Sequence, residues 1–451
     1  MAHSFDAFII GGGPAGQHLA RYLAQHDFTV GIAEYRGFGG TCALRGCDPK
    51  RIMATVSEAV DGVDRLVGKG VAGEARMAWD DVRAFVTSII EPIPERAEER
   101  LRELGIATFT DKATFTGPGR LTVAGESVEA QHVIIATGQR PAPLDVPGEA
   151  FAKTSDDFHH LEAIPERVLF VGGGYIGLET AHICCRLGAE VTILHNDDDP
   201  LPMFEGDLAD GLVAATRELG IRFVLDTEVT AIEQADTGFR VSAKTTDGET
   251  CHYDTDLVMN TAGRVPNVEG LGLDALGIDL AGGSGIEVDA YLRVEGHDGL
   301  YAIGDISASD GPPLTPVATL EAKALAATLR GTPTAPSYAG LPTAVYSLPE
   351  LAGVGLSEAE AREQGYDVAV VAKLDATEQF NAKRSNARAY AYKTVVDKAT
   401  DKLLGATILG PDASEVINLF ALAIRAGIDV EHLRDTPYAY PTWSSDVAGM
   451  V

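Results

Sequence analysis

The chain has 451 residues, of which 45% are hydrophobic and 23% are charged. This length suits two to four domains, and this composition is typical of a globular protein that buries a sizeable core. The formal net charge of −30 argues against a nucleic-acid partner, because neutralising phosphates requires a basic patch. We interpret the acidity as a solvated surface, which would also suit a saline cytoplasm.

The sequence contains no apolar run of the length that a membrane span needs. Its first residues, Met1–Phe5, form neither a basic region nor an apolar signal stretch, so we expect a cytoplasmic protein with no membrane partner. The five cysteines are not spaced as a disulfide framework. No cluster of His and Cys has the spacing of metal ligands, so we expect no metal site.

The N-terminal segment combines an apolar strand, a glycine turn and a helix in the order that a dinucleotide site needs. A strand over residues 5–10 leads into a turn and helix start formed by Gly11, Gly12, Gly13, Pro14, Ala15 and Gly16. Glycines let the backbone approach a pyrophosphate, and the helix N-terminus favours its negative charge. A second strand over 28–34 ends in Glu34, where an acceptor for ribose hydroxyls belongs.

A second segment repeats this order later in the chain. The strand 167–171 leads into Gly172, Gly173, Gly174, Tyr175, Ile176 and Gly177, and the next strand covers 190–194. We therefore predict two bound dinucleotides. After the second strand, a carboxylate would hold the ribose of NADH and arginines would hold the phosphate of NADPH. His195 and Asn196 fit neither pattern cleanly. Asn196 and a protonated His195 would tolerate a phosphate, whereas the aspartates at 197–199 would repel it if they face it, which slightly favours NADH.

The remaining segments have mixed character. Residues 77–105 favour an amphipathic helical insertion, residues 106–135 favour short strands, and the Pro/Gly-rich stretch 141–148 is a plausible linker. From about residue 340 onward, strands alternate with helices, which indicates an appended α+β module. We expect its strands at 344–346 and 389–396 and its helices at 357–365 and 412–426.

Several motifs together resemble the pyridine nucleotide–disulfide oxidoreductase family, over essentially the whole chain. The segment Gly39–Lys50, which contains Gly40, Thr41, Cys42 and Cys47, resembles that family's redox-disulfide helix. Five further segments resemble other motifs of the family. They are Ala136-Thr137-Gly138, Thr261–Asn267 with Gly263 and Arg264, Leu300–Asp305 with Gly304 and Asp305, Leu314-Thr315-Pro316-Val317-Ala318, and Lys402–Pro411.

The resemblance implies an α/β fold with two Rossmann-like dinucleotide-binding domains, for FAD and NAD(P)H, plus a C-terminal α+β dimerisation domain. The implied ranges are 1–150 for the first part of the FAD domain, 151–268 for the NAD(P)H domain, 269–337 for the second, central part of the FAD domain, and 338–451 for the interface domain. It also implies a homodimer.

The residues between and after the two cysteines point to thiolate chemistry. A helix N-terminus next to cations lowers the pKa of a cysteine, and Arg45 and Lys50 supply such cations. By the resemblance, Cys47 would exchange electrons with the flavin and Cys42 would meet the substrate.

The resemblance also assigns groups around the flavin. Lys50 would pair with Glu179 beside the reactive flavin nitrogen, Tyr175 would cover the flavin face, and Asp305 would accept from the ribityl chain. Leu314–Ala318 would lay a helix N-terminus near the flavin.

The C-terminal segment departs from the family pattern. Tyr440 stands where the family has a His, and Ser445 stands where it has a Glu; in the family the two act as a base–acid dyad from the partner subunit. A positioned His contributes roughly 10²–10⁴ in rate. Three readings follow: Tyr440 donates a proton to an unusual disulfide, carbonyl-like or quinone substrate; Asp48 substitutes as acid/base; or the thiols pass electrons to an acceptor that needs no proton shuttle.

We therefore expect an enzyme, an FAD-dependent NAD(P)H oxidoreductase that relays electrons through Cys42–Cys47 to an unusual disulfide or related small-molecule acceptor. The alternative is a diaphorase-like reductase of quinones, metals or oxygen in which the cysteines are not essential. A third reading is a flavoprotein that binds a partner and has lost turnover.

Overall fold

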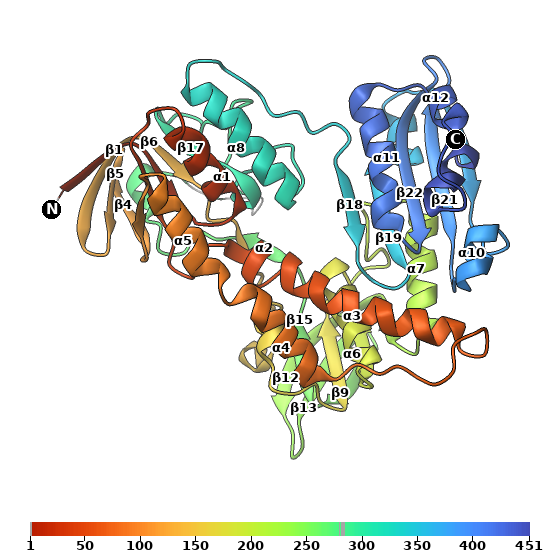
Figure 1. Ribbon diagram of the computed structural model, residues 1–451. Coiled ribbons are helices and arrows are strands. Elements are labelled where there is room, and N and C mark those ends of the chain that lie inside the picture. The colour runs from red at the N-terminus through yellow and green to blue at the C-terminus, as the bar shows by residue number, and fades with distance from the viewer. Residues whose placement is uncertain (1, 279, 281–284) are drawn as a thin grey trace. The chain divides into compact units, whose positions relative to one another are not determined.

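The computed structural model describes residues 2–278, 280 and 285–451, which fall into two compact units (Figure 1). Unit 1 consists of Met1–Pro49, Phe85–Ala142 and Arg264–Tyr338, and unit 2 consists of Lys50–Ala84, Pro143–Gly263 and Ala339–Val451. The finer division into four segments that the sequence predicts stays a prediction.

Unit 1 is built on a seven-stranded sheet in which β1 is central. Strands β3, β2, β1, β6 and β17 run parallel, and β5 and β4 continue from β6 as an antiparallel extension. The strands are β1 (Ala2–Ile10), β2 (Val30–Ala33), β3 (Ala107–Phe109), β4 (Ala113–Gly117), β5 (Arg120–Val123), β6 (Glu126–Ile135) and β17 (Leu300–Ala302). A short antiparallel pair joins β7 (Gln139–Pro141) to β16 (Arg264–Pro266).

Helices cover one face of this sheet because their apolar sides pack on the strands. The cluster around Leu19, Ile134 and Leu325 joins α1, the parallel strands and α8, and α1 and α8 lie side by side (Figure 1). The helices of unit 1 are α1 (Pro14–Ala24), α2 (Gly40–Leu44), α5 (Ile93–Glu103) and α8 (Thr315–Leu329), with short 3₁₀ turns η3 (Leu273–Leu276) and η4 (Gly304–Ile306). Helices α3 (Cys47–Leu66) and α4 (Trp79–Ile90) each contribute residues to both units.

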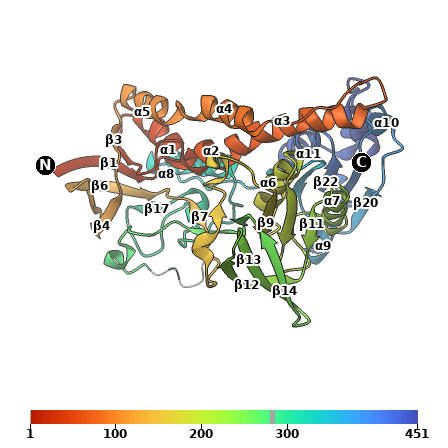
Figure 2. The same cartoon turned by 90° about the horizontal axis from the view of Figure 1, so that it is seen from below.

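The first half of unit 2 contains a second parallel sheet of five strands in the order β11-β10-β9-β15-β8. These are β8 (Lys153–Thr154), β9 (Arg167–Val171), β10 (Glu190–Leu194), β11 (Arg222–Val224) and β15 (Leu257–Asn260), with α6 (Tyr175–Arg186), α7 (Gly206–Glu218) and the 3₁₀ turns η1 (Glu149–Phe151) and η2 (Phe158–His160). An antiparallel three-stranded sheet, β12 (Thr227–Gln234), β13 (Phe239–Thr245) and β14 (Thr250–Thr255), lies beside β9 (Figure 2).

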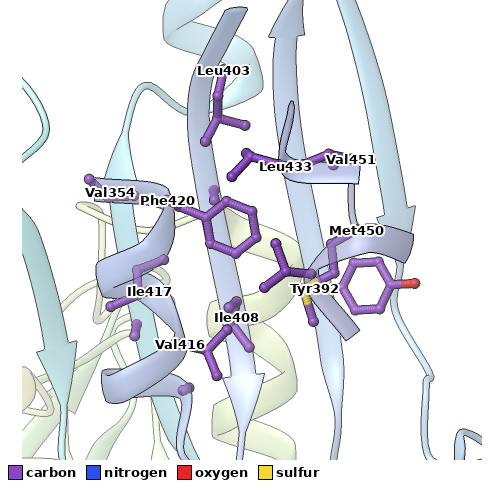
Figure 3. Packing of buried hydrophobic residues seen from close by; sticks show 14 of the residues in the cluster. Val354, Tyr392, Leu403, Ile408, Val416, Ile417, Phe420, Leu433, Met450 and Val451 are labelled. Atoms are coloured by element: carbon purple, nitrogen blue, oxygen red, sulfur yellow. The ribbon is translucent and has the colours of Figure 1, made fainter. Parts of the chain in front are cut away.

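The second half of unit 2 is an α+β module with an antiparallel sheet in the order β18-β19-β22-β21-β20. Its elements are β18 (Pro342–Val345), β19 (Glu350–Gly355), α9 (Glu358–Glu363), β20 (Val368–Lys373), α10 (Phe380–Ser385), β21 (Ala391–Asp397), β22 (Lys402–Gly410), α11 (Ala413–Ala426), α12 (Val430–Asp435) and η5 (Trp443–Gly449). The core of this module is apolar. Phe420 of α11 packs over Ile408 and Leu403 of β22, and Met450, near the C-terminus, packs into the same cluster (Figure 3).

The predicted fold class is therefore confirmed: two Rossmann-type sheets and a C-terminal α+β module are present. One expected element is different, because residues 77–105 form two helices, α4 and α5, separated at Glu91–Pro92. A proline lacks the backbone N–H that continues a helix and fits its first turn, so Pro92 ends one helix and starts the next. Across residues 2–278, 280 and 285–451, no helix combines the length and apolar character that crossing a membrane requires.

Candidate active site

The first glycine turn folds tightly against the sheet of unit 1. Gly11 has a φ of +118°, and a Cβ there would lie 2.2 Å from the carbonyl oxygen of Ala136. A Cβ at Gly16 would lie 1.9 Å from the carbonyl oxygen of Gly11, so α1 can approach the turn only without a side chain at this position. A Cβ at Gly13, in contrast, would make only an ordinary contact with Gly40 Cα at 3.8 Å, and Gly13 lines a cavity. The turn thus leaves backbone free for a ligand at the N-terminus of α1.

Glu34 ties the end of β2 to this turn. Its Oε2 accepts a hydrogen bond from the Gly12 N–H at 2.8 Å, and its Oε1 accepts from the Arg36 N–H at 2.6 Å. The side chain is buried yet lines the cavity. Because a carboxylate has about four acceptor positions, Glu34 keeps acceptor capacity beyond these two bonds, and its contact with ribose hydroxyls stays a prediction.

The cavity of unit 1 encloses about 1080 Å³ of empty space including its open mouth. Many residues that the sequence singles out line it: Gly11, Gly13, Pro14, Ala15, Glu34, Gly40, Thr41, Cys42, Thr137, Gly138, Gly304, Asp305, Thr315 and Ala318. Gly16, Leu314 and Pro316 support the turn and the start of α8 instead. Arg264 donates from its guanidinium to the Gln139 carbonyl oxygen at 2.5 Å and so holds β16 to β7.

This cavity fits a dinucleotide cofactor. The hydroxyl oxygen of Thr137 is buried in its wall without a hydrogen-bond partner in the described part of the chain, which a ligand atom would supply. Arg36, Lys112 and Arg140 also line it, and the sequence analysis missed all three. Lys112 follows β3, so the rule that ligands bind at the carboxyl ends of parallel strands would have pointed to it. An FAD would lie with its pyrophosphate at Gly13 and its adenosine ribose at Glu34.

Asp305 lies in the 3₁₀ turn after β17, and burial raises the pKa of its carboxyl although the charge of Arg264 opposes this shift. The turn is held by Glu321 of α8, which accepts from the Gly304 N–H and the Ser309 hydroxyl, both at 2.6 Å. Glu321 also accepts from the Tyr338 hydroxyl at 2.8 Å. Sequence reasoning missed Glu321, although an acidic residue within the apolar stretch of α8 was a usable signal.

The two thiols meet at the start of α8. The Thr315 hydroxyl donates to Cys42 Sγ at 3.0 Å and lies 3.9 Å from Cys47 Sγ. Cys42 is half-buried in the cavity wall, whereas Cys47 is exposed. The expectation that Cys47 faces the flavin stays a prediction.

The pKa of Cys42 is raised rather than lowered, which corrects the expectation from the helix position and the cations. The causes are its hydrogen bond with the Cys47 thiol and its burial, and the charge of Asp48 adds to them. The Thr315 hydrogen bond acts in the opposite direction. In the reduced pair, contact with the second thiol and burial therefore disfavour a negative charge on Cys42. Asp48 itself lies in the first turn of α3, and burial raises the pKa of its carboxyl.

The second glycine turn, in unit 2, repeats the geometry of the first. Gly172 has a φ of +100°, and its Cβ would lie 2.5 Å from the Thr261 carbonyl oxygen. A Cβ at Gly177 would lie 2.2 Å from the Gly172 carbonyl oxygen, while a Cβ at Gly174 would meet open space. The predicted residues Gly172, Gly174, Tyr175, Ile176 and Gly177 thus form a turn and the start of α6, with Gly174 at the N-cap. These residues fit the pyrophosphate of a second dinucleotide.

His195 directly follows β10, and its Nδ1 accepts a hydrogen bond from the Gly173 N–H at 3.1 Å. Asn196 and the three aspartates after it are exposed. Gly263, at the end of the segment after β15, has a φ of +114° and open space where a Cβ would lie. The parts that these residues play toward a nicotinamide dinucleotide stay predictions.

A buried ion pair joins α3 to α6 within unit 2. Lys50 Nζ lies 2.5 Å from Glu179 Oε2, and Glu179 Oε1 accepts from the Tyr346 N–H at 3.1 Å. Lys50 Nζ also lies 5.1 Å from the centre of the Tyr175 ring. The predicted Lys50–Glu179 pair is present, and its function toward a flavin stays a prediction.

Tyr440 is presented on the surface of the interface module, with 75% of it exposed. Its ring stacks on Phe380 at 6.3 Å between centroids. Ser445 does not support it, because the Ser445 hydroxyl donates to the Thr442 carbonyl oxygen at 2.5 Å within a capping box. The carboxylate of Asp446 accepts from Asn381 and Tyr390, both at 2.8 Å. Neither Ser445 nor Asp446 therefore takes the place, beside Tyr440 of the same chain, of the glutamate that the family pattern has there.

Comparison with known proteins agrees with this arrangement. The pyridine nucleotide-disulphide oxidoreductase family matches residues 5–322, and the dimerisation domain of that family matches residues 341–451. The chain is 34% identical over 446 residues to a glutathione reductase of Burkholderia cepacia, covering 98% of each chain. It is 32% identical over 466 residues to a glutathione reductase of Nostoc sp., covering all of both chains.

A third relative carries a different name. The chain is 30% identical over 457 residues to a dihydrolipoyl dehydrogenase of Halobacterium salinarum, covering 97% of this chain and 94% of that one. These relatives, which match over nearly their whole length, thus carry two different enzyme names. The chain therefore belongs to the pyridine nucleotide-disulphide oxidoreductase family and is a flavin-dependent oxidoreductase that uses FAD and NAD(P)H.

Proposed function

We propose that the chain relays electrons from NAD(P)H, through FAD, to the Cys42–Cys47 pair and then to an external disulfide or closely related acceptor. The observation that carries the proposal is the meeting of both sulfurs at the Thr315 hydroxyl, on the wall of a cavity that fits a dinucleotide. FAD, when bound, supplies the two-electron carrier between a nicotinamide and sulfur. A structural disulfide would not need a hydroxyl hydrogen-bonded to one of its sulfurs.

The thiol step is a two-stage exchange in which electrons and protons balance. The Cys42 thiolate attacks one sulfur of the acceptor, a mixed disulfide forms, and the first product thiolate leaves and takes up the proton of the Cys47 thiol. The Cys47 thiolate formed in this way then attacks Cys42 Sγ, which restores the Cys42–Cys47 disulfide and releases the second product thiolate, and this thiolate takes a proton from solvent. The hydrogen bond between the two thiols supports this order, because Cys42 can pass its proton to Cys47 before it attacks.

Tyr440 favours reduction of the acceptor over oxidation of a dithiol. Reduction requires an acid that protonates a leaving thiolate, whereas oxidation of a dithiol requires a base. A phenol carries an O–H that can donate a hydrogen bond or a proton. The direction of reaction in the name glutathione reductase, a reduction, therefore suits this chain better than the oxidation in the name dihydrolipoyl dehydrogenase.

Tyr440 would act from a second subunit. Its ring is exposed, and in the described residues its hydroxyl has no hydrogen-bond partner of the same chain. We infer a homodimer through the dimerisation domain at 341–451, in which Tyr440 of one subunit approaches Cys42 of the other.

An anaerobic titration with NADH, repeated with NADPH, tests the relay. Full bleaching of the flavin only after two two-electron equivalents, with a long-wavelength thiolate–flavin band after the first, is the expected result. Cys42→Ser and Cys47→Ser should each abolish reduction of small disulfides, and Cys251→Ser, which alters a half-buried cysteine on β14, should not.

The opposite results are equally specific. Bleaching after one equivalent without a long-wavelength band would place the thiols outside the electron path. The diaphorase alternative would be established by two results together: the wild type reduces no disulfide, and the Cys42→Ser variant reduces quinones as fast as the wild type.

A further inference from the structure

The segment that carries Tyr440 is fastened to helix α10 in two ways. The Tyr440 ring stacks on Phe380, the first residue of α10, with 25° between the ring planes. The next residue of α10, Asn381, donates from its side-chain amide to the Thr442 carbonyl oxygen at 2.9 Å. One turn of α10 therefore holds both the ring of Tyr440 and the backbone two residues after it.

Asn381 is buried, and its amide is fully used. Besides the bond to Thr442, its Nδ2 donates to Asp446 Oδ1 at 2.8 Å, and its Oδ1 accepts from Arg384 Nε at 2.8 Å. A carbonyl oxygen only accepts hydrogen bonds and a guanidinium only donates them, so these partners fix which end of the amide is which. Asn381 therefore cannot turn without breaking three hydrogen bonds.

The partner of Asn381 is itself held by the core of the interface module. The Tyr390 hydroxyl donates to Asp446 Oδ2 at 2.8 Å. Burial raises the pKa of Tyr390, and the charge of Asp446 adds to this shift, so the hydroxyl remains a donor. The Tyr390 ring also packs edge-on against Trp443 at 5.1 Å between centroids. Both sides of the Tyr440 segment are thus anchored in one rigid hydrogen-bonded group.

This anchoring acts on the backbone of the segment and leaves the polar end of Tyr440 untouched. In the part of the chain that the structure describes, the phenol hydroxyl has no hydrogen-bond partner, and 75% of the residue is exposed. Ser445, at the position of the family's glutamate, bonds to Thr442 instead. The direction of the phenol is therefore set by the stacked ring and by the hold on the Thr442 carbonyl.

We propose that Asn381 is a positioning residue for Tyr440: by holding the Thr442 carbonyl, it fixes where the phenol offers its O–H to a thiolate that leaves the acceptor. This inference rests on the proposed function of Tyr440 as a donor in disulfide reduction. A displacement of about 1 Å in a reacting group can cost roughly a hundredfold in rate. A donor helps most when the leaving thiolate is strongly basic, because such a thiolate leaves slowly unaided.

The test compares two disulfides in the FAD-loaded full-length protein. One is an alkyl disulfide, whose product thiol resembles cysteine with a pKa of about 8.5, and the other is a nitrophenyl disulfide, whose product thiol is much more acidic. The readout is the ratio of kcat/KM for the alkyl disulfide to kcat/KM for the nitrophenyl disulfide. Tyr440→Phe should lower this ratio about tenfold, because only the alkyl thiolate depends on the donor.

Asn381→Ala should lower the same ratio by a similar factor although the phenol is still present. The double variant Asn381→Ala/Tyr440→Phe should lower it no further than either single variant, since both changes remove one function. Asn418→Ala is the matched control, because the exposed Asn418 amide also donates to a backbone carbonyl, that of Ser414 at 2.9 Å, and it should keep the wild-type ratio.

A reciprocal exchange separates positioning from stability. The pair Asn381→Asp and Asp446→Asn restores a hydrogen bond between these two positions and keeps an acceptor for Tyr390, but the Thr442 carbonyl loses its donor. This double variant should regain the urea midpoint that Asn381→Ala loses, while its rate ratio stays low. A ratio that recovers together with the midpoint would overturn the proposal, because Asn381 would then support only the fold.

The remaining outcomes distinguish this inference from the proposed function. If Tyr440→Phe lowers the ratio and Asn381→Ala does not, the function assigned to Asn381 is wrong and that of Tyr440 stands. If Tyr440→Phe leaves the ratio unchanged, the phenol is not a donor and both assignments fail. If the wild type reduces neither disulfide, the proposed function itself is wrong, and the inference falls with it.

Discussion

Removing the hydroxyl of Thr315 gives a direct test of the thiol site. This hydroxyl donates to Cys42 Sγ at 3.0 Å and lowers the pKa of that thiol, against the effects of Cys47 and of burial. A hydrogen bond to a charged group contributes roughly 1.5–3 kcal/mol. Because Cys42 is only half-buried, the lower end of this energy range applies. A free energy of about 1.4 kcal/mol corresponds to roughly a tenfold change in an equilibrium constant. Thr315→Val should therefore reduce the thiolate fraction of Cys42 about tenfold at neutral pH.

The rate of alkylation by iodoacetamide reports this change. A less acidic thiol is intrinsically more nucleophilic, with a Brønsted slope of about 0.4–0.5, so a tenfold loss of thiolate is offset by roughly a threefold gain. Alkylation of Cys42 in Thr315→Val should thus be about threefold slower at pH 7. The measurement is made in a Cys47→Ser background, so that only one thiol of the pair reacts, and the peptide that carries Cys42 is quantified by mass spectrometry.

Two variants separate the hydrogen bond from packing. Thr315→Ser keeps the hydroxyl and should retain the original rate. Thr319→Val removes the next hydroxyl along α8, which bonds to the backbone oxygen of Thr315 at 3.3 Å, and should have no effect. An unchanged rate in Thr315→Val would refute the reasoning, since the hydroxyl would then not stabilise the thiolate.

Three further predictions concern charges. Lys393 is buried against Glu205 at 3.0 Å and Glu358 at 3.0 Å, so Lys393→Met should destabilise unit 2 by about 2–4 kcal/mol, whereas the exposed Lys398→Met should cost about 0.5 kcal/mol or less. Urea unfolding followed by tryptophan fluorescence measures both effects, because the two tryptophans of the chain lie in unit 2. Burial lowers the pKa of Lys393, but the carboxylates of Glu205 and Glu358 outweigh this effect and raise it. The stability that the ion pairs of Lys393 contribute is therefore complete below the ordinary lysine pKa of about 10.4 and is lost only at higher pH. A loss of this stability near neutral pH would contradict the prediction. Glu321→Ala should release the Gly304 turn, because three hydrogen bonds are lost, and should increase the loss of FAD on dialysis about tenfold or more. Retention of FAD equal to that of the wild type would show that Glu321 does not hold the flavin site. Asp48→Asn removes a charge that raises the pKa of Cys42 and should speed its alkylation about two- to threefold at pH 7, whereas a slower reaction would show that Asp48 assists the thiol as a base.

The sheets could be predicted from sequence because their strands are short apolar runs that end at glycines. The strands at 167–171 and 190–194 begin and end where the pattern places them. The insertion at 77–105 was less predictable, because its apolar period continues across Pro92 while the chain itself turns there. Periodicity records which side chains are buried, and it does not record an interruption of the helix that keeps the same side chains buried.

The site was predictable where one motif holds all its parts and less so where distant segments meet. Glu34 follows the first turn within one βαβ segment, and its hydrogen bond to Gly12 could be anticipated. Glu321 reaches Gly304 from another helix, and no local pattern encodes that approach. The raised pKa of Cys42 was missed for the same reason, since it depends on contact with a second thiol and on burial, not on position in a helix.

The proton requirements of the thiol pair and of the C-terminal segment agree with each other. The neighbouring thiol and partial burial disfavour a charge on Cys42, so attack on an acceptor begins with transfer of its proton to Cys47, and Cys47 gives that proton to the first leaving thiolate before it attacks in turn. The leaving thiolate needs a proton donor, and the exposed phenol of Tyr440 carries one. Tyr440→Phe should therefore slow the reduction of a disulfide whose product thiolate is a poor leaving group more than that of a disulfide whose product thiolate is a good one, and an equal effect on both would show that Tyr440 only positions the substrate.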